Sequence, residues 1–102
     1  MSAQRFKVLL VEDEQPLVSL YKEYLKEEPL DITHASSGKE ALKYLAGQEP
    51  DVILLDVRLP DMNGTEILDF IQERGMNSAV IMITAHGSIN MAVETMRGGA
   101  YD

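Results

Sequence analysis

The sequence predicts a doubly wound α/β fold with a parallel sheet, because strand-like and helix-like patterns alternate strictly along the chain. Two of the strand-like runs, Val8–Val11 and Val52–Leu55, are wholly apolar. Such runs are typical of strands buried on both faces, as in parallel sheets. With 102 residues and a hydrophobic fraction of 45%, the chain is long enough for one domain with one core, which we expect to span residues 1–102.

The first predicted unit is a strand over Phe6–Val11 followed by a helix. The helix is expected to begin at Pro16, where the missing N–H of proline costs nothing, and to have ended by Pro29. Five apolar residues at helical spacing are expected to form its buried face: Leu17, Leu20, Tyr21, Tyr24 and Leu25.

The second unit begins with a weaker strand over Asp31–Ala35, which we expect at a sheet edge. Ser37–Glu40 is a capping-box sequence that should begin the next helix. Gly47 is expected to end that helix in a left-handed conformation. The apolar stripe of the helix is Ala41, Leu42 and Leu45.

The second half of the chain repeats the pattern. One strand, Val52–Leu55, ends at Asp56, and another, Ala79–Ile83, ends at Thr84. The two expected helices are marked by Ile67, Leu68 and Ile71 with a stop near Gly75, and by Ile89–Met96 with a stop at Gly98–Gly99. In such folds ligands bind beyond the carboxyl ends of the strands, where the strand order reverses.

The composition excludes several kinds of site. Without cysteine the chain has no disulfide or thiolate metal site, and two histidines are too few for a histidine-based metal cage. The net charge is −8 and no Lys/Arg cluster is present, so we expect no direct nucleic-acid binding. No apolar run approaches the ~20 residues that cross a bilayer, and residues 1–7 do not resemble a signal peptide. We therefore expect a cytoplasmic protein without a membrane anchor.

Polar side chains stand at the carboxyl ends of three predicted strands. Glu12 and Asp13 follow the first, Asp56 ends the third and Thr84 ends the fourth. If the first and third strands are neighbours, three carboxylates meet at one rim, where two unit charges ~5 Å apart repel by about 3 kcal/mol at an effective dielectric of ~20. A set of oxygen ligands of this kind favours Mg²⁺.

This constellation predicts phosphoryl chemistry at Asp56, the carboxylate on the middle strand. A carboxylate can attack phosphorus and form an aspartyl-phosphate. Glu12 and Asp13 would hold the metal, and the Thr84 hydroxyl would donate to a phosphoryl oxygen. The small side chain of Ala85 would leave room for the phosphoryl donor.

Each of these residues taken alone has a plainer interpretation. Acidic residues at strand ends are common as helix caps and turn formers, which applies singly to Glu12, Asp13 and Asp56. Thr84 alone is most simply a β-branched strand residue. The prediction of a site depends on all four residues lying at one edge of the sheet.

Four stretches of the sequence resemble the receiver domain of bacterial response regulators, and the resemblance covers essentially the whole chain. They are Val8–Glu14, Pro50–Asp56, Leu59–Gly64 and Thr84–Gly87. The resemblance implies a flavodoxin-like, CheY-like fold. It also implies that a sensor histidine kinase or a phosphotransfer protein donates a phosphoryl group, which switches an output domain.

The last part of the chain narrows the resemblance. Three stretches look similar to receivers of NtrC-type activators, which drive sigma-54 promoters: Thr84–Ile89, Ala92–Glu94 and Gly99–Asp102. Three others look similar to the LuxO-like members of that group: Val11–Asp13, Leu20–Tyr21 and Arg58–Met62. This similarity implies a transcriptional output domain.

The receiver resemblance implies a role for each matching acidic residue. Asp56 matches the phosphoacceptor. Asp13, Asp56 and the backbone carbonyl of Arg58 match the direct Mg²⁺ ligands. Glu12 matches the second acidic position, where the family more often has Asp.

Other matching residues shape the site. Thr84 matches the switch hydroxyl that moves toward the phosphoryl group, and Pro60 and Gly64 match the loop around the site. Receivers continue with a fifth strand, a Lys-Pro pair and a fifth helix, whereas this sequence stops at Asp102. We therefore expect a receiver that is incomplete at its C-terminus, binds Mg²⁺ but switches poorly, and exposes a strand edge through which two copies could form a homodimer.

Two other functions stay open at this point. A phosphatase of the haloacid-dehalogenase type needs a second Asp two residues after its nucleophile, and Arg58 stands there, so we do not expect an enzyme. A degenerate receiver that acts only as a binding module would keep the fold without accepting phosphoryl. The intact carboxylate set argues against this alternative, and the missing lysine argues for it.

Overall fold

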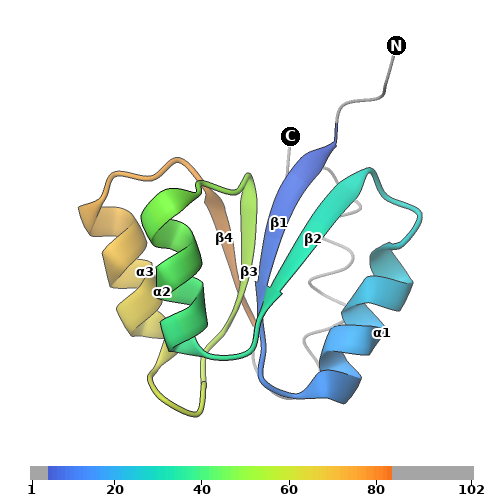
Figure 1. Ribbon diagram of the computed structural model, residues 1–102, viewed down its shortest axis with the longest axis horizontal. Helices are drawn as coiled ribbons and strands as arrows, with labels where there is room; N and C mark the ends of the chain where they lie inside the picture. The colour runs from blue at the N-terminus through green and yellow to red at the C-terminus, as the bar shows by residue number, and fades with distance from the viewer. Residues whose placement is uncertain (1–4, 84–102) are drawn as a thin grey trace.

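The computed structural model describes residues 5–83, which form a parallel sheet covered by helices on both faces (Figure 1). The sheet order is β2-β1-β3-β4, so the order reverses between β1 and β3. This confirms the doubly wound α/β fold. The elements are β1 (Phe6–Val11), α1 (Gln15–Leu25), β2 (Leu30–Ala35), α2 (Gly38–Gly47), β3 (Val52–Asp56), α3 (Gly64–Glu73) and β4 (Ala79–Ile83).

Alternate residues of the central strands feed two separate hydrophobic cores. On one face, Val8 and Leu10 pack with residues of α1, and on the other Leu9 and Val11 pack with residues of α2 and α3. Figure 1 shows the same division, with α1 on one side of the sheet and α2 and α3 together on the other. Burial on both faces explains why β1 and β3 are continuous apolar runs.

The buried face of α1 differs from the predicted one. The predicted Tyr21 and Leu25 are buried, together with Val18, which was not predicted. The predicted Leu20 and Tyr24, however, are 39% and 41% exposed. Leu20 and Tyr24 each precede a buried residue by one position, which places them about 100° around the helix from that residue. The residues that face the sheet depend on how the helix lies against it, which the periodicity does not determine.

The ends of α2 confirm one expectation and contradict two. The Ser37 hydroxyl accepts the Glu40 N–H at 3.2 Å, as a helix cap should. The Glu40 carboxylate, however, accepts the Ser36 hydroxyl at 2.5 Å, so the predicted capping box is only half formed. Gly47 is the last helical residue and does not adopt a left-handed conformation, because an extended Gln48 ends the helix. The predicted end of the next helix, α3, near Gly75 is confirmed, and Gly75 itself is left-handed, with φ at +64°.

Several expectations concern parts of the chain that the structure does not describe. Thr84, Ala85 and the helix predicted over Ile89–Met96 lie outside the described residues. The pairing of two copies along the fourth strand also stays a prediction. Among residues 5–83, no helix is long and apolar enough to cross a membrane.

The loop between β3 and α3 passes close to the end of β3. The Gly64 N–H donates to the Val57 carbonyl at 2.8 Å. A Cβ atom added at Gly64 would collide with the backbone carbonyl oxygen of Asp56, and backbone cannot move aside as easily as a side chain. Glycine is therefore required here by the close approach of two backbone segments.

We predict that Gly64→Ala lowers the free energy of unfolding by about 1–3 kcal/mol, the usual cost of forcing extra atoms into a packed site. Gly47→Ala is the matched control, because nothing lies within 4 Å of a Cβ added there. It should leave stability unchanged or raise it by up to about 1 kcal/mol, since alanine favours helix over glycine. Urea unfolding of the two variants measures both effects. Equal stability of Gly64→Ala and the unsubstituted protein would contradict the prediction.

Candidate functional site

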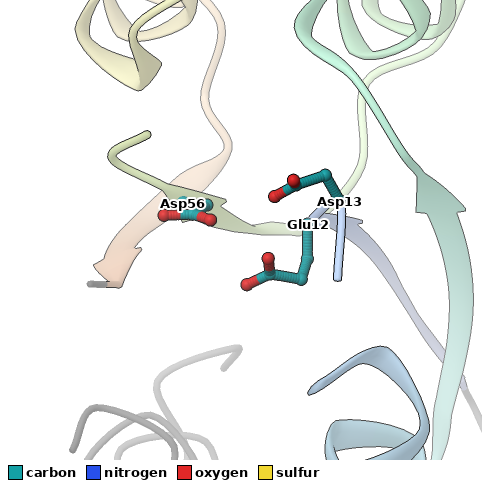
Figure 2. A group of neighbouring side chains, drawn as sticks. All are labelled: Glu12, Asp13 and Asp56. Atoms are coloured by element: carbon teal, nitrogen blue, oxygen red, sulfur yellow. The ribbon is translucent and has the colours of Figure 1, made fainter. Parts of the chain in front are cut away.

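Three carboxylates meet where the sheet order reverses. Glu12 and Asp13 directly follow β1, and Asp56 is the last residue of β3, the strand paired with β1. One carboxylate oxygen from each residue lies within 4.8 Å of the others. Figure 2 shows the Glu12 and Asp13 side chains directed from the end of β1 toward Asp56. The predicted meeting of the three acidic residues at one rim is therefore confirmed.

The three side chains differ in their access to solvent. Glu12 is 2% exposed and Asp56 is 5% exposed, whereas Asp13 is exposed. Two negative groups thus lie below the surface and a third marks the opening to solvent. Buried charges are costly unless they are paired, bonded or held by a metal, so this arrangement is suited to a cation.

The electrostatics of Glu12 reflect this position. The pKa of the Glu12 carboxyl is raised from its ordinary 4.5 to about 7, mainly by burial and also by the nearby Asp56 carboxylate. The Glu14 N–H donates to the Glu12 carboxylate at 3.2 Å and opposes the rise in pKa. Without a cation, the site therefore favours a proton on Glu12 at mildly acidic pH.

The same negative charges act on the phenol of Tyr21. The pKa of the Tyr21 phenol is raised to about 12, mainly by burial and also by the charges of Glu12 and Asp56. The side chain is 1% exposed and belongs to the core under α1. Tyr21 therefore stays neutral at physiological pH.

Backbone groups of the following loop orient Asp56. The Arg58 N–H donates to Asp56 Oδ1 at 3.1 Å, and a bridge between Arg58 and Asn63 closes the loop. Gly64 is buried against the Asp56 backbone, while Pro60 is exposed.

Two contacts around the site escaped the sequence analysis. Asp61 joins the loop to α2, because its two carboxylate oxygens accept the N–H groups of Gly38 and Lys39, each at 2.9 Å. These bonds lower the pKa of the Asp61 carboxyl. His34 of β2 contacts the backbone carbonyl of Glu12 at 2.7 Å. Both contacts join residues more than 20 positions apart, and no local sequence signal indicates either of them.

The donor set fits a hard divalent cation. All three side chains offer carboxylate oxygens, the ligands that Mg²⁺ prefers, and the exposed Asp13 leaves room for bound water. Among residues 5–83, this is the group of acidic side chains close enough together to hold a metal.

Comparison with known proteins agrees with the fold. The family described as the response regulator receiver domain matches residues 8–102. The regulatory protein LuxO of Vibrio cholerae is 43% identical over 93 residues, covering 91% of this chain and 20% of LuxO. The response regulator protein PilR of Pseudomonas aeruginosa is 39% identical over 98 residues, covering 96% and 22%. The chain thus spans about a fifth of the length of these relatives.

A solved structure shows the same architecture. The signal receiver domain of a LuxO repressor protein from Vibrio parahaemolyticus superposes with a TM-score of 0.77 at 44% identity. The match covers 94% of this chain and 74% of that structure. With its sheet order, its acidic rim and these similarities, the chain belongs to the response regulator receiver domain family.

Proposed function

We propose that this chain is the phosphoacceptor domain of a two-component response regulator and that Asp56 receives the phosphoryl group. The observation that carries the proposal is the meeting of Glu12, Asp13 and Asp56 oxygens within 4.8 Å at the reversal of the sheet. A divalent cation is needed to bring an anionic donor to such a site. The family match supports a signalling role for the domain.

The residues proposed to hold Mg²⁺ are Glu12, Asp13 and Asp56, with the backbone carbonyl of Arg58 as a further ligand. When bound, Mg²⁺ would neutralise negative charge on the carboxylates and on the donor's phosphoryl oxygens. Glu12 reaches the rim with a longer side chain than aspartate. Its burial and its bond from Glu14 fix it toward Asp56.

In the proposed reaction, a carboxylate oxygen of Asp56 attacks the phosphorus of a phosphohistidine on the kinase or the phosphotransfer protein. A carboxylate O–P bond forms as the N–P bond breaks, and the imidazole nitrogen keeps the electron pair. The Arg58 N–H on Oδ1 orients the carboxylate for this attack. We propose that Pro60 and Gly64 shape the loop and that the small Ala85, which lies outside the described residues, leaves space for the donor.

The added phosphoryl group carries a charge of about −1.5 to −2. We propose that the Thr84 hydroxyl moves toward it and that this biases a two-state surface read by an output domain. The similarity to LuxO and PilR supports a transcriptional output, and we propose one that acts at sigma-54 promoters. The chain spans about a fifth of the length of these relatives. We therefore propose, rather than observe, both the output domain and the kinase as its partners.

We predict that acetyl phosphate with Mg²⁺ adds one phosphoryl group to the protein, detected by intact mass, and that Asp56→Asn abolishes the adduct. The amide of asparagine keeps the shape of the side chain but is not a nucleophile. Asp69→Asn, an exposed substitution on α3 away from the three carboxylates, should be phosphorylated normally.

Other outcomes of this experiment point to the alternative functions. Continuous phosphate release from varied phosphate esters would indicate a phosphatase. A protein that binds Mg²⁺ but never forms the adduct would be a binding module, and the proposed function would be wrong. An adduct that persists in Asp56→Asn would place the phosphoacceptor elsewhere.

We also predict that, without divalent cations, the free energy of unfolding falls as the pH rises from about 4.5 to about 7. In this window the unfolded chain has lost the Glu12 proton while the folded protein still holds it, because the folded pKa is raised from 4.5 to about 7. The unfolded state binds fewer protons, so stability decreases with pH. Above the folded pKa both states are ionised and this slope ends.

Glu12→Gln is the matched variant, since its amide is neutral at every pH in this range. Urea unfolding at several pH values should show a shallower fall in stability for Glu12→Gln than for the unsubstituted protein. Saturating Mg²⁺ should restore stability to the unsubstituted protein at neutral pH, because a ligand that binds only the folded state stabilises it. Parallel curves for the two proteins would contradict the raised pKa.

A further inference from the structure

The parallel pairing of β1 with β2 ends at the residue before the acidic rim. The last register pair is Val11 with Ala35, and the Glu12 N–H still donates to the Ala35 carbonyl at 3.1 Å. Beyond this point the chain turns at Ser37 into α2. Strand β2 therefore ends where its next backbone N–H would be needed for the Glu12 carbonyl.

The His34 side chain meets that carbonyl instead. Its ring nitrogen Nε2 lies 2.7 Å from the Glu12 carbonyl oxygen, although the residues are 22 positions apart in sequence. A carbonyl oxygen only accepts hydrogen bonds, so the facing Nε2 carries the proton and donates it. The histidine thus extends the β1–β2 ladder by one bond at the end of β1.

Glu12 is consequently held at three points. Its N–H donates to β2, its carbonyl accepts from His34, and its carboxylate accepts the Glu14 N–H. The Glu12 carbonyl belongs to the peptide unit that joins Glu12 to Asp13, so fixing it sets the direction in which both carboxylates leave the strand. Groups that orient metal ligands in this way strongly affect metal affinity even though they do not touch the ion.

We infer that His34 is a positioning residue, which holds the Glu12–Asp13 peptide so that both carboxylates converge on Asp56. This inference rests on the proposed function of the rim as a cation and phosphoacceptor site. His34 is half-buried on the outer strand of the described sheet and belongs to neither of the hydrophobic cores. Its replacement should therefore affect the rim more than the stability of the fold.

A pair of amide variants tests the inference by the reach of the donor. In His34→Gln, the side-chain amide nitrogen occupies nearly the position of Nε2 and can still donate to the Glu12 carbonyl. In His34→Asn, the same amide is one methylene shorter and falls short of it. His34→Leu removes the donor altogether, and Thr33→Val changes the neighbouring exposed residue of β2 without touching the carbonyl.

Mg²⁺ affinity, measured by calorimetry on each purified variant, is the main readout. We expect His34→Asn and His34→Leu to bind Mg²⁺ about 10-fold more weakly, the usual order for loss of a group that orients metal ligands. His34→Gln and Thr33→Val should bind as the unsubstituted protein does. Phosphorylation by acetyl phosphate should slow in the Asn and Leu variants at low Mg²⁺ and recover at saturating Mg²⁺. A purely structural role would not produce this pattern.

Urea unfolding of each variant shows whether the fold is intact, so that affinity is compared only between folded proteins. If His34→Leu does not fold, the Mg²⁺ affinities of the folded His34→Gln and His34→Asn variants still show whether the hydrogen bond to the Glu12 carbonyl is needed. Equal Mg²⁺ affinity of all variants would overturn the role of His34 while leaving the phosphoacceptor function in place. Absence of Mg²⁺ binding and of phosphorylation in the unsubstituted protein would instead overturn the proposed function itself.

Discussion

The candidate site is defined by one unfavourable interaction, the electrostatic repulsion among three carboxylates at the carboxyl ends of two adjacent strands. Glu12 and Asp56 are almost fully buried, so neither can relieve the repulsion by turning into water. Burial, and to a smaller extent the neighbouring Asp56 charge, raises the pKa of the Glu12 carboxyl to about 7. The protein keeps this arrangement because two apolar strands place the residues there, and a cation at the rim would convert the repulsion into binding energy.

The surroundings of the rim hold the carboxylates in place through backbone groups. Arg58 donates to Asp56, Glu14 donates to Glu12, and Asp61 ties the loop after β3 to the start of α2. Backbone N–H groups are fixed by the fold and lose no side-chain freedom when they bond, so they suit a site that must stay organised. Movement of the loop after β3 would also displace the start of α2, because Asp61 bonds to Gly38 and Lys39.

Much of the fold and the centre of the site could be predicted from the sequence because both depend on strong local signals. The apolar runs that form β1 and β3 end directly in acidic residues, and the alternation of elements implies a parallel sheet whose strand ends meet. The exact limits of the buried face of α1 could not be predicted, because Leu20 and Tyr24 continue the apolar spacing of the buried Tyr21 and Leu25 although they are exposed. The contact of His34 with Glu12 was also missed, since it depends on where β2 ends relative to β1 in space.

The most direct test of the acidic rim is a crystal structure of the protein with Mn²⁺, which occupies Mg²⁺ sites and can be located by anomalous scattering. The ion should lie at about 2.0–2.2 Å from carboxylate oxygens of Asp13 and Asp56, with Glu12 close by or joined through water. An ion bound elsewhere, or none at the rim at millimolar Mn²⁺, would contradict the assignment of these three residues to a cation and phosphoacceptor site.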